Sequence, residues 1–422
     1  MNADWTMIEE RLDRQIRIAG WDQIALSSSR VCILGDDDLL ASLFALSASA
    51  LGINDLVMLA PMLDEALIEA ARKINPNFSL TFIEGSFTHP ALSDLFQGSR
   101  VVVDLSAFGL ANKLAIEKAY RDGLPVIRAL RFQEGTNAAG VKVFSYMRGR
   151  EWDELRSLIS SNNLPEKHVD DGVFDTIAVG IALEEVKNIL MGRQAASEVI
   201  SYTTQQTAPA AKSPRVLVVG AGALGNFVGL GLAFSKISNI TFMDPDIIEI
   251  ANLNRQVFFY EAIGRGKAKT LAKRLNEIFG TDAKFHSDYF GAETDISEFD
   301  VVFDCVDNFE TRILLSEKCR EYGKILISGG TSATAGQVIV YDPAANEKTP
   351  AELLGLYEII KERKSEPAER DRQSCRYTPD PSVIMTNQII GGIMVDTYRM
   401  ALAGNSPGNI FYDSENEEKV LK

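Results

Sequence analysis

An acidic residue, an arginine and a lysine follow one another at short intervals in the second half of the chain. Asp244 ends the apolar stretch NITFMD, Arg255 lies eleven residues further on within DPDIIEIANLNRQ, and Lys267 belongs to GRGKAK. A carboxylate at a strand end can accept hydrogen bonds from a ribose. The planar guanidinium group offers paired donors to phosphate oxygens, and the lysine adds a compact positive charge.

A second carboxylate lies just beyond another predicted strand. Asp307, in DCVDNFETR, follows the apolar residues VVFD. Ligands bind at the carboxyl edge of open α/β sheets, and a carboxylate there among phosphate-binding cations suits magnesium. Two cations and a metal ligand exceed the needs of the pyrophosphate bridge of NAD. They predict a site for a nucleoside triphosphate from which pyrophosphate leaves.

The elements that must position these residues begin with a glycine-rich turn. Residues 216–219, VLVV, read as a buried parallel strand. Gly220, Gly222 and Gly225 form a GxGxxG motif, after which a helix is expected. The next strand ends at Asp244, nineteen residues after the last of these glycines. This spacing predicts a βαβ unit of the nucleotide-binding type.

The first half of the chain repeats this pattern. Residues 30–61 resemble 215–245, and residues 100–129 resemble 300–329 at an offset of 200. A repeat of such long period predicts two copies of one α/β domain.

The repeat divides the chain into two domains. We expect a degenerate domain over 1–195, a linker over 196–214 and a second domain over 215–422. Each should be a mostly parallel, Rossmann-like sheet with helices on both faces. The two copies should pack face to face as a pseudo-dimer.

The copies differ where a nucleotide would bind. GAGALG becomes GDDDLL at 35–40, which places carboxylates where a phosphate needs bare backbone N–H groups. Asp244 is replaced by Ala60, and Asp307 by Ala107. The offset between the copies rises from 184 to 200, so 200 − 184 = 16 residues are absent from the first copy. We infer one working site, in the second copy, with the first copy as its structural partner.

Composition and charge exclude several classes of protein. Of the 422 residues, 46% are hydrophobic and 24% are charged, which is typical of a soluble globular protein. The net charge of −15 argues against broad binding to nucleic acid. No long apolar run predicts a membrane span, and the polar N-terminus does not read as a secretory signal, so a cytoplasmic protein is expected. The four cysteines form no CxxC pair, so no zinc site is predicted.

Taken together, these motifs resemble the ubiquitin-activating-enzyme-like superfamily, which includes ThiF and MoeB. The resemblance is carried by GAGALG, DPDIIEIANLNRQ, GRGKAK, DCVDNFETR and, near the N-terminus, RLDRQIRIAGW. The tandem copies are similar to the inactive and active adenylation halves of ubiquitin-type activating enzymes. The resemblance implies an enzyme that uses ATP and magnesium to adenylate a carboxylate, usually the C-terminus of a ubiquitin-like β-grasp protein.

The resemblance also implies roles for individual residues. Asp307 would bind the magnesium ion, and Arg14, in RLDRQ, would reach from the first half as an arginine finger. Arg255, Lys267 and Asp307 would thus be catalytic together with Arg14. The residues expected to bind ATP are Gly220, Gly222, Gly225, Asp244, Asp246, Asn252, Arg255, Gln256 and Lys267.

Cys375 lies where the family carries its reactive cysteine, between the strand GQVIVYD and a late helix. Three nearby arginines could lower the pKa of its thiol: Arg370, Arg372 and Arg376. It ends an insert around 344–375 in which Thr349 and Glu352 resemble a helix capping box. The resemblance implies that the acyl group passes to Cys375 as a thioester, and then to a downstream conjugating enzyme.

Other functions stay open at this point. One is adenylation of a peptide or small carboxylate without a cysteine relay, which a Cys375→Ala variant would distinguish. Another is a non-catalytic nucleotide-binding scaffold. An NAD oxidoreductase would bind NAD in preference to ATP–magnesium, and the acidic charge disfavours a tRNA-modifying relative.

Overall fold

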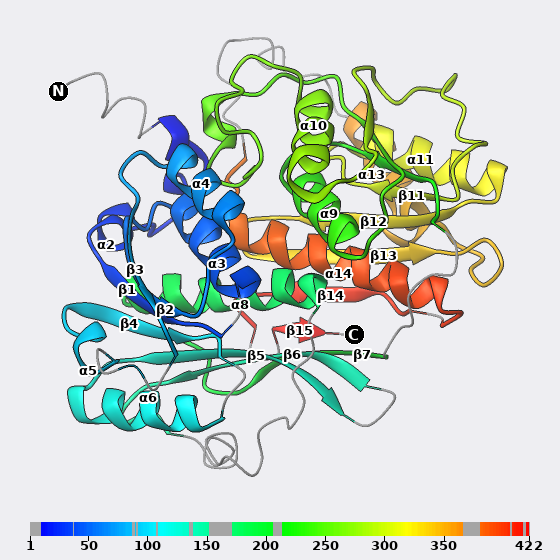
Figure 1. The fold of residues 1–422 in the computed structure, drawn as a ribbon. Helices are drawn as coiled ribbons and strands as arrows, with labels where there is room; N and C mark the ends of the chain where they lie inside the picture. Colours follow the sequence, from blue (N-terminus) through cyan, green and yellow to red (C-terminus); the bar gives the residue numbers. More distant parts are fainter. Residues whose placement is uncertain are drawn as a thin grey trace.

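The fold is that of a computed structural model and consists of two β-sheets, each covered by helices (Figure 1). The described residues are 10–36, 38–86, 89, 92–106, 109–134, 138–151, 171–205, 213–365, 380–405, 407–416 and 419–421. Within them, no helix combines the length and apolarity needed to cross a membrane.

The first sheet has seven strands in the order β3-β2-β1-β4-β5-β6-β7. The first five strands in chain order are parallel, and β6 and β7 are antiparallel to their neighbours. Their bounds are β1 Arg30–Leu34, β2 Asp55–Ala60, β3 Ser79–Glu84, β4 Ser99–Asp104, β5 Val126–Glu134, β6 Ala138–Tyr146 and β7 Ile200–Gln205.

The second sheet repeats this topology with one further strand, in the order β10-β9-β8-β11-β12-β13-β14-β15. Strands β8 to β12 are parallel, and β13 to β15 are antiparallel. The bounds are β8 Val216–Val219, β9 Ile240–Met243, β10 Lys284–His286, β11 Val301–Asp304, β12 Ile325–Thr331, β13 Ala335–Tyr341, β14 Ile410–Asp413 and β15 Val420–Leu421. The shared strand order confirms two Rossmann-like copies of one fold.

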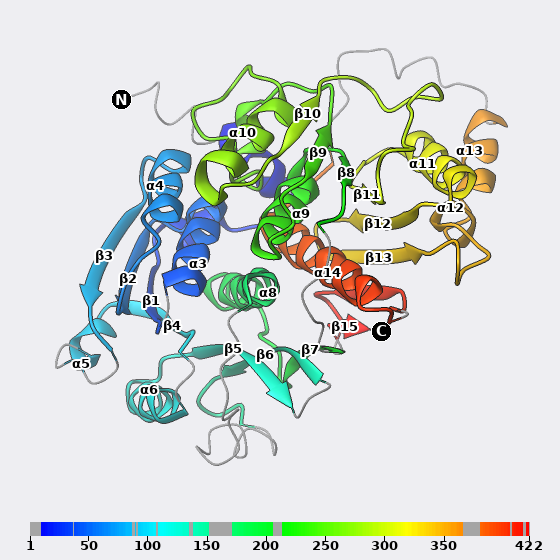
Figure 2. The same ribbon diagram turned by 45° about the vertical axis from the view of Figure 1, so that its right-hand side comes forward.

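Helices cover both faces of each sheet (Figure 2). The first copy contains a helical stretch over 10–16, α2 Gln23–Ser27, α3 Asp38–Leu51, α4 Glu65–Ile74, α5 Leu92–Leu95, α6 Gly109–Asp122 and α8 Gly172–Leu190. The second contains α9 Ala223–Phe234, the short 3₁₀ helix η1 Ile250–Asn252, α10 Lys267–Phe279, α11 Phe309–Tyr322, α12 Pro350–Leu353, α13 Leu356–Ser365 and α14 Ile384–Leu402. One continuous apolar core runs through α3, α8, α9 and α14, and it therefore joins the two copies.

The two copies meet where α8 packs against α14 (Figure 2). A Cβ built on Gly180 would lie 2.6 Å from Cγ1 of Ile389, and a Cβ built on Gly392 would lie 2.6 Å from Cγ1 of Ile177. These two contacts are related by an offset of 212 in both directions, as in the isologous interface of a two-fold dimer. The predicted pseudo-dimer is therefore present within one chain.

The predicted linker over 196–214 contains a strand. Ile200, Tyr202 and Thr204 are buried in alternation with exposed neighbours, and this segment pairs with β6 as strand β7. The alternation is the pattern of a half-buried strand, which the polar composition of the segment obscured. Of the predicted linker, residues 206–212 lie outside the described part of the chain.

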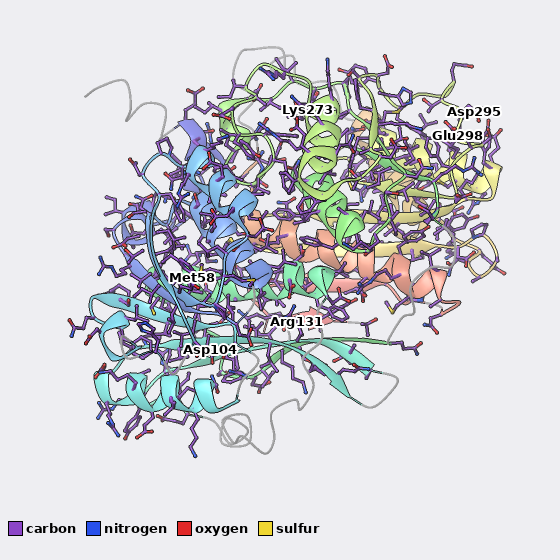
Figure 3. All side chains as sticks on the ribbon, in the orientation of Figure 1. Met58, Asp104, Arg131, Lys273, Asp295 and Glu298 are labelled. Carbon is purple, nitrogen blue, oxygen red and sulfur yellow. The ribbon has the colours of Figure 1, made fainter. Side chains whose placement is uncertain are left out.

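A buried carboxylate occupies the same place in both sheets. Asp104 ends β4 beside β1 (Figure 3), and Asp304 ends β11 beside β8. In the first copy, Arg128 of β5 bonds Asp104 at 2.6 Å; in the second, Arg312 of α11 lies 3.4 Å from Asp304. At offset 200 the counterparts of these arginines are Ser328 and Asn112, and each also bonds its carboxylate. The buried carboxylate thus has an arginine partner in both copies, although that arginine comes from strand β5 in the first copy and from helix α11 in the second.

Candidate functional site

The glycine-rich turn between β8 and α9 packs against the turn that follows β11. Gly220 has φ +95°, and a Cβ there would lie 2.5 Å from the carbonyl oxygen of Cys305. A Cβ on Gly225 would collide with the carbonyl oxygen of Gly220. Only glycine meets these constraints, because it has no Cβ and tolerates positive φ. The packing brings the turn that carries Asp307 to the glycine loop.

Asp244 ties the end of β9 to the glycine loop. Its carboxylate accepts hydrogen bonds from the backbone N–H of Ala221, at 2.7 Å, and of Asp246, at 2.8 Å. The residue is buried, and burial raises the pKa of its carboxyl, while the charge of Lys267 opposes that rise. The carboxylate therefore stands at the end of the strand, beside the loop, where a ribose contact was expected.

Lys267 starts α10 and points back to the strand end. Its Nζ lies 2.8 Å from Oδ2 of Asp246, whose side chain is 59% exposed. A backbone bridge between Ile247 and Gly266 holds the base of this segment together. An exposed partner competes weakly for the lysine, since water screens the pair. The lysine can therefore exchange Asp246 for a stronger anion.

Arg255 is a buried cation held by neutral acceptors. Its Nη1 donates to the carbonyl oxygen of Ala251 and to Oδ1 of Asn254, both at 2.7 Å. No carboxylate forms an ion pair with it among the described residues. Burial, together with the charge of Arg14, lowers the pKa of Arg255 to about 10, although Glu249 acts in the opposite direction. The site thus concentrates positive charge that a bound anion would neutralise.

Arg14 comes to this cluster from the first copy. Its Nη1 donates to the carbonyl oxygen of Asp380 at 3.3 Å, and its own carbonyl accepts from the N–H of Ser382 at the same distance. These contacts lie just before α14, so Arg14 sits where the first copy meets the second. The position is that expected of an arginine reaching across the pseudo-dimer.

Two predicted amide residues flank Arg255. Oδ1 of Asn252 accepts from the N–H of Glu249 at 2.9 Å, which leaves its amide N–H groups for a ligand. Gln256 is buried, and its Oε1 has no hydrogen-bond partner among the described residues. A Cβ on Gly222 would meet only the side-chain amide nitrogen of Gln256, at 3.9 Å, so the backbone of the loop is open to close approach by a ligand.

Asp307 is suited to a metal ion whose remaining ligands come from the substrate. It is exposed beyond the end of β11, and its carboxylate has no hydrogen-bond or ion-pair partner in the described part of the chain. The described residues contain no cluster of three or more His, Cys, Asp or Glu side chains that could hold a metal alone. Magnesium is commonly bound by one or two carboxylates plus substrate phosphates, which matches a single exposed carboxylate on the turn that packs against the glycine loop.

Comparison with known proteins identifies the family. The model of the ThiF family matches residues 191–417, more than half of the chain. The chain belongs to the ThiF family. The matched region covers the glycine loop, Arg255, Lys267 and Asp307, together with α14.

Named relatives share part of this region. The chain is 36% identical to "Adenylyltransferase and sulfurtransferase MOCS3" of Dictyostelium discoideum over 30% of this chain and 31% of that protein. It is 33% identical to "Adenylyltransferase and sulfurtransferase UBA4" of Candida albicans over 40% of this chain and 38% of that protein. It is 29% identical to "Molybdopterin-synthase adenylyltransferase" of Haemophilus influenzae over 42% of this chain and 74% of that protein. The match thus spans about a third of the length of the first two relatives.

The three cysteines that the structure describes in this ThiF-family chain are not suited to nucleophilic chemistry. Cys375, with its three neighbouring arginines, lies outside the described residues. Cys32, Cys305 and Cys319 are buried, and burial raises the pKa of each thiol, to about 12 for Cys32. A raised pKa suppresses the thiolate that a nucleophile needs. These three residues are therefore core side chains, as their strand and helix positions predict.

The insert before the undescribed segment begins with the expected capping box. Thr349 and Glu352 exchange hydrogen bonds across the first turn of α12. Glu352 also forms an ion pair with Arg320 of α11, which fixes the insert to the second copy.

This ion pair predicts a pH dependence of stability. Arg320, followed by the N–H of Thr349, lowers the pKa of Glu352 from 4.5 to about 2. A lowered pKa in the folded state means stabilisation that is complete above pH 4.5 and is lost as the pH falls towards 2. Both side chains are a third or more exposed, so the effect should not exceed about 1 kcal/mol.

The test compares Glu352→Gln with the wild type in urea unfolding. At pH 6 the variant should be less stable, and the difference should shrink as the pH falls through this range. Glu358→Gln, an exposed change on α13, is the control and should lose nothing. A difference that persists at low pH would show that the ionised form of Glu352 is not the source.

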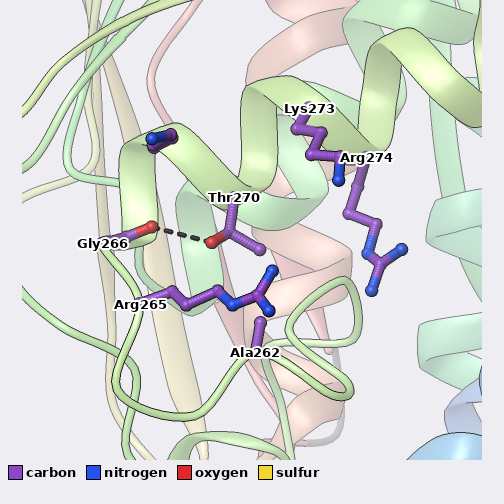
Figure 4. Close-up of a pocket in the computed structure, with 7 residues that line it drawn as sticks. Ala262, Arg265, Gly266, Thr270, Lys273 and Arg274 are labelled. Atoms are coloured by element: carbon purple, nitrogen blue, oxygen red, sulfur yellow. Dashed lines mark hydrogen bonds between the residues drawn. The ribbon is translucent and has the colours of Figure 1, made fainter.

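Two hollows lie beside the cluster. One, of about 500 Å³, is lined by Arg265, Lys269, Lys273, Arg274 and neighbouring residues of α10 and the preceding loop (Figure 4). The other, of about 480 Å³, is lined by acidic residues including Asp295 and Glu298 and by no Lys or Arg (Figure 3). Neither contains Arg255 or Lys267 in its lining. The candidate site is therefore defined by its charged residues and not by either hollow.

Three further residues shape the cluster, and no motif singled them out. Asn226 donates to the carbonyl oxygens of Ala221 and Gly222, at 3.1 and 2.9 Å, and so braces the glycine loop. Asn254 and Gln15 form a buried contact between the copies, at 3.0 Å. Both lie inside a quoted motif and next to a predicted arginine, but no role was predicted for either.

Proposed function

We propose that this protein is an ATP-dependent adenylating enzyme that acts on the C-terminal carboxylate of a ubiquitin-like protein. One observation carries the proposal. A buried arginine from the second copy lies near an arginine from the first, and among the described residues only neutral groups accept hydrogen bonds from it. An unpaired buried charge is costly, and a polyanionic ligand removes that cost.

The names of the relatives supply the chemistry. Two are called adenylyltransferase and sulfurtransferase, and the third molybdopterin-synthase adenylyltransferase. In such a reaction an oxygen of the acyl carboxylate attacks the α-phosphorus of ATP. The bond from that phosphorus to the oxygen bridging the β-phosphate breaks, and pyrophosphate leaves with the electron pair. The products are an acyl-adenylate and pyrophosphate.

The residues of the cluster fit the needs of this step. Asp244 would hold the ribose, while Arg255, Lys267 and the amide of Asn252 would bind phosphate oxygens. Arg14 adds charge from the first copy. Negative charge grows on the departing pyrophosphate, and fixed cations stabilise it without reorganisation. Magnesium, held by Asp307, would supply further positive charge to the phosphates when bound.

The finer assignment concerns the fate of the acyl group. In the leading proposal, the thiolate of Cys375 attacks the acyl carbon of the adenylate, AMP leaves, and a thioester forms. The alternative is adenylation without a cysteine relay, in which another nucleophile takes the acyl group. The non-catalytic scaffold is disfavoured because the chain carries Arg255, Lys267 and Asp307, which catalysis would need.

The experiment mixes the protein with ATP, magnesium and small β-grasp proteins that end in Gly-Gly. Pyrophosphate release is measured, and the products are run on a gel with and without thiol reductant. A reductant-sensitive adduct lost in Cys375→Ala would support the thioester route. Release that is unchanged in Cys375→Ala, with no adduct, would support adenylation alone. Absence of pyrophosphate release with every such partner would overturn the proposed function.

A further inference from the structure

We propose that Gln15, in the first copy, is a positioning residue for Arg255 and acts on it through the side chain of Asn254. The proposal rests on the proposed function, because it concerns the arginine that would bind the phosphates of ATP. It assigns the first copy a task separate from supplying Arg14. Gln15 and Asn254 lie 254 − 15 = 239 residues apart in the chain.

The amide of Gln15 is fixed at both ends. Its Nε2 donates to the carbonyl oxygen of Leu51, at 2.8 Å, and to Oε1 of Gln23, at 2.7 Å. Its Oε1 accepts from Nδ2 of Asn254 at 3.0 Å. The residue is fully buried, so water cannot replace these contacts cheaply. Because the donor end is committed within the first copy, the oxygen must face the second.

That oxygen determines which way Asn254 points. Asn254 is also fully buried, and its Nδ2 faces Gln15 and, more distantly, the carbonyl oxygen of Ser382. Its Oδ1 is thereby left facing Arg255, whose Nη1 donates to it at 2.7 Å. Rotation of the Asn254 amide by half a turn would place an N–H₂ group against the guanidinium, donor against donor. Gln15 therefore selects the orientation in which Arg255 has an acceptor.

A neutral acceptor serves a phosphate-binding arginine better than a carboxylate would. The Asn254 oxygen and the carbonyl oxygen of Ala251 hold the same nitrogen, Nη1, and so orient the guanidinium plane. The positive charge stays uncompensated and available to an anion. A carboxylate at this position would orient the arginine equally well but would compete with the ligand for its charge.

The experiment is a double-mutant cycle between Gln15→Met and Arg255→Ala. Binding of ATP–magnesium is measured by calorimetry, and kcat and KM for ATP are measured from pyrophosphate release. In the wild-type background, Gln15→Met should reduce ATP affinity and kcat/KM by about 10- to 100-fold, as expected for a displaced contact group. In the Arg255→Ala background the same change should have little effect, because the group it positions is gone.

Urea unfolding of each variant guards against simple unfolding. A second variant, Asn254→Asp, keeps an oxygen facing Arg255 and neutralises the charge that the phosphates need; its other oxygen would face Oε1 of Gln15, acceptor against acceptor, so its stability is measured as well. It should weaken ATP binding at least as much as Gln15→Met. Arg17→Met, an exposed change in the turn just after the same helical stretch, breaks only a pair with Asp13; it is the matched control and should bind ATP as the wild type does.

The outcomes separate this proposal from the proposed function. If Gln15→Met lowers ATP affinity by the same factor in both backgrounds, its role is structural and the positioning proposal is overturned. The same holds if wild-type affinity survives Asn254→Asp. If the wild type binds ATP through Arg255 but releases no pyrophosphate with any partner, the adenylation proposal fails, and the binding cycle still decides the role of Gln15. If ATP does not bind at all, both are overturned.

Discussion

The Arg255→Ala variant is expected to release pyrophosphate about 10²- to 10³-fold more slowly than the wild type, since one fixed donor to developing charge contributes on that scale. Arg255 as a residue is 7% exposed, so a phosphate bound to it is shielded from water. Shielding strengthens the charge-assisted hydrogen bond relative to one at the surface. No other buried cation in the described part of the glycine-loop cluster could replace it.

The matched control is Arg265→Ala. Arg265 lies on the segment that leads into α10, is exposed, and lines the neighbouring basic hollow (Figure 4). Both variants remove one positive charge, so long-range attraction of ATP falls equally in each. Pyrophosphate release is measured at saturating ATP and again at low ATP. If Arg255→Ala is no slower than Arg265→Ala, the buried arginine has no role in the phosphate site.

The Asp104→Ala variant should lose about 3–5 kcal/mol of stability, which is the usual cost of leaving a buried charge without its partner. Asp104 and Arg128 are both fully buried and bond at 2.6 Å. Nε and Nη2 of Arg128 have no partner among the described residues, so its one charged contact is with Asp104. Asn112 and Ser106 also donate to the carboxylate and would lose their acceptor.

Urea unfolding followed by circular dichroism measures this loss. Asp122→Ala, at the exposed end of α6, breaks only a surface pair with Lys118 and should cost under about 1 kcal/mol. The double variant Asp104→Leu with Arg128→Met should recover most of the stability, because replacing a whole buried pair by apolar groups is often neutral. Equal losses of stability in Asp104→Ala and in the control Asp122→Ala would show that the buried pair is not the source of the effect.

The exchange of the arginine between copies explains why this pair escaped the sequence comparison. Aligned at offset 200, Arg128 stands opposite Ser328, and Asn112 stands opposite Arg312, so each position looks unrelated. Only the packing shows that either position can reach the same carboxylate. The first copy has kept the buried pair although it carries Ala60 where the second has Asp244. The scaffold was thus retained where the candidate ligand contacts were not.

Local patterns in the chain suffice for much of the fold and for the members of the site. Buried strands appear as apolar runs, and the glycines mark a turn whose backbone no other residue tolerates. Asp244 and Asp307 are found at strand ends because parallel strands carry their ligands at the carboxyl edge. The repeat of these signals also predicted two sheets of one topology, which the strand orders confirm.

The arrangement of buried polar groups follows from packing instead. Whether Arg255 has a carboxylate partner, which way Asn254 faces, and that Gln15 lies behind it depend on how the two copies meet along α8 and α14. Hydrogen bonds between side chains hundreds of residues apart leave no periodicity in the chain, because each residue satisfies its own local element equally well without them. The chain itself therefore specifies which groups are present, and the contact between its two halves specifies which of them are oriented and which charge is left for a ligand.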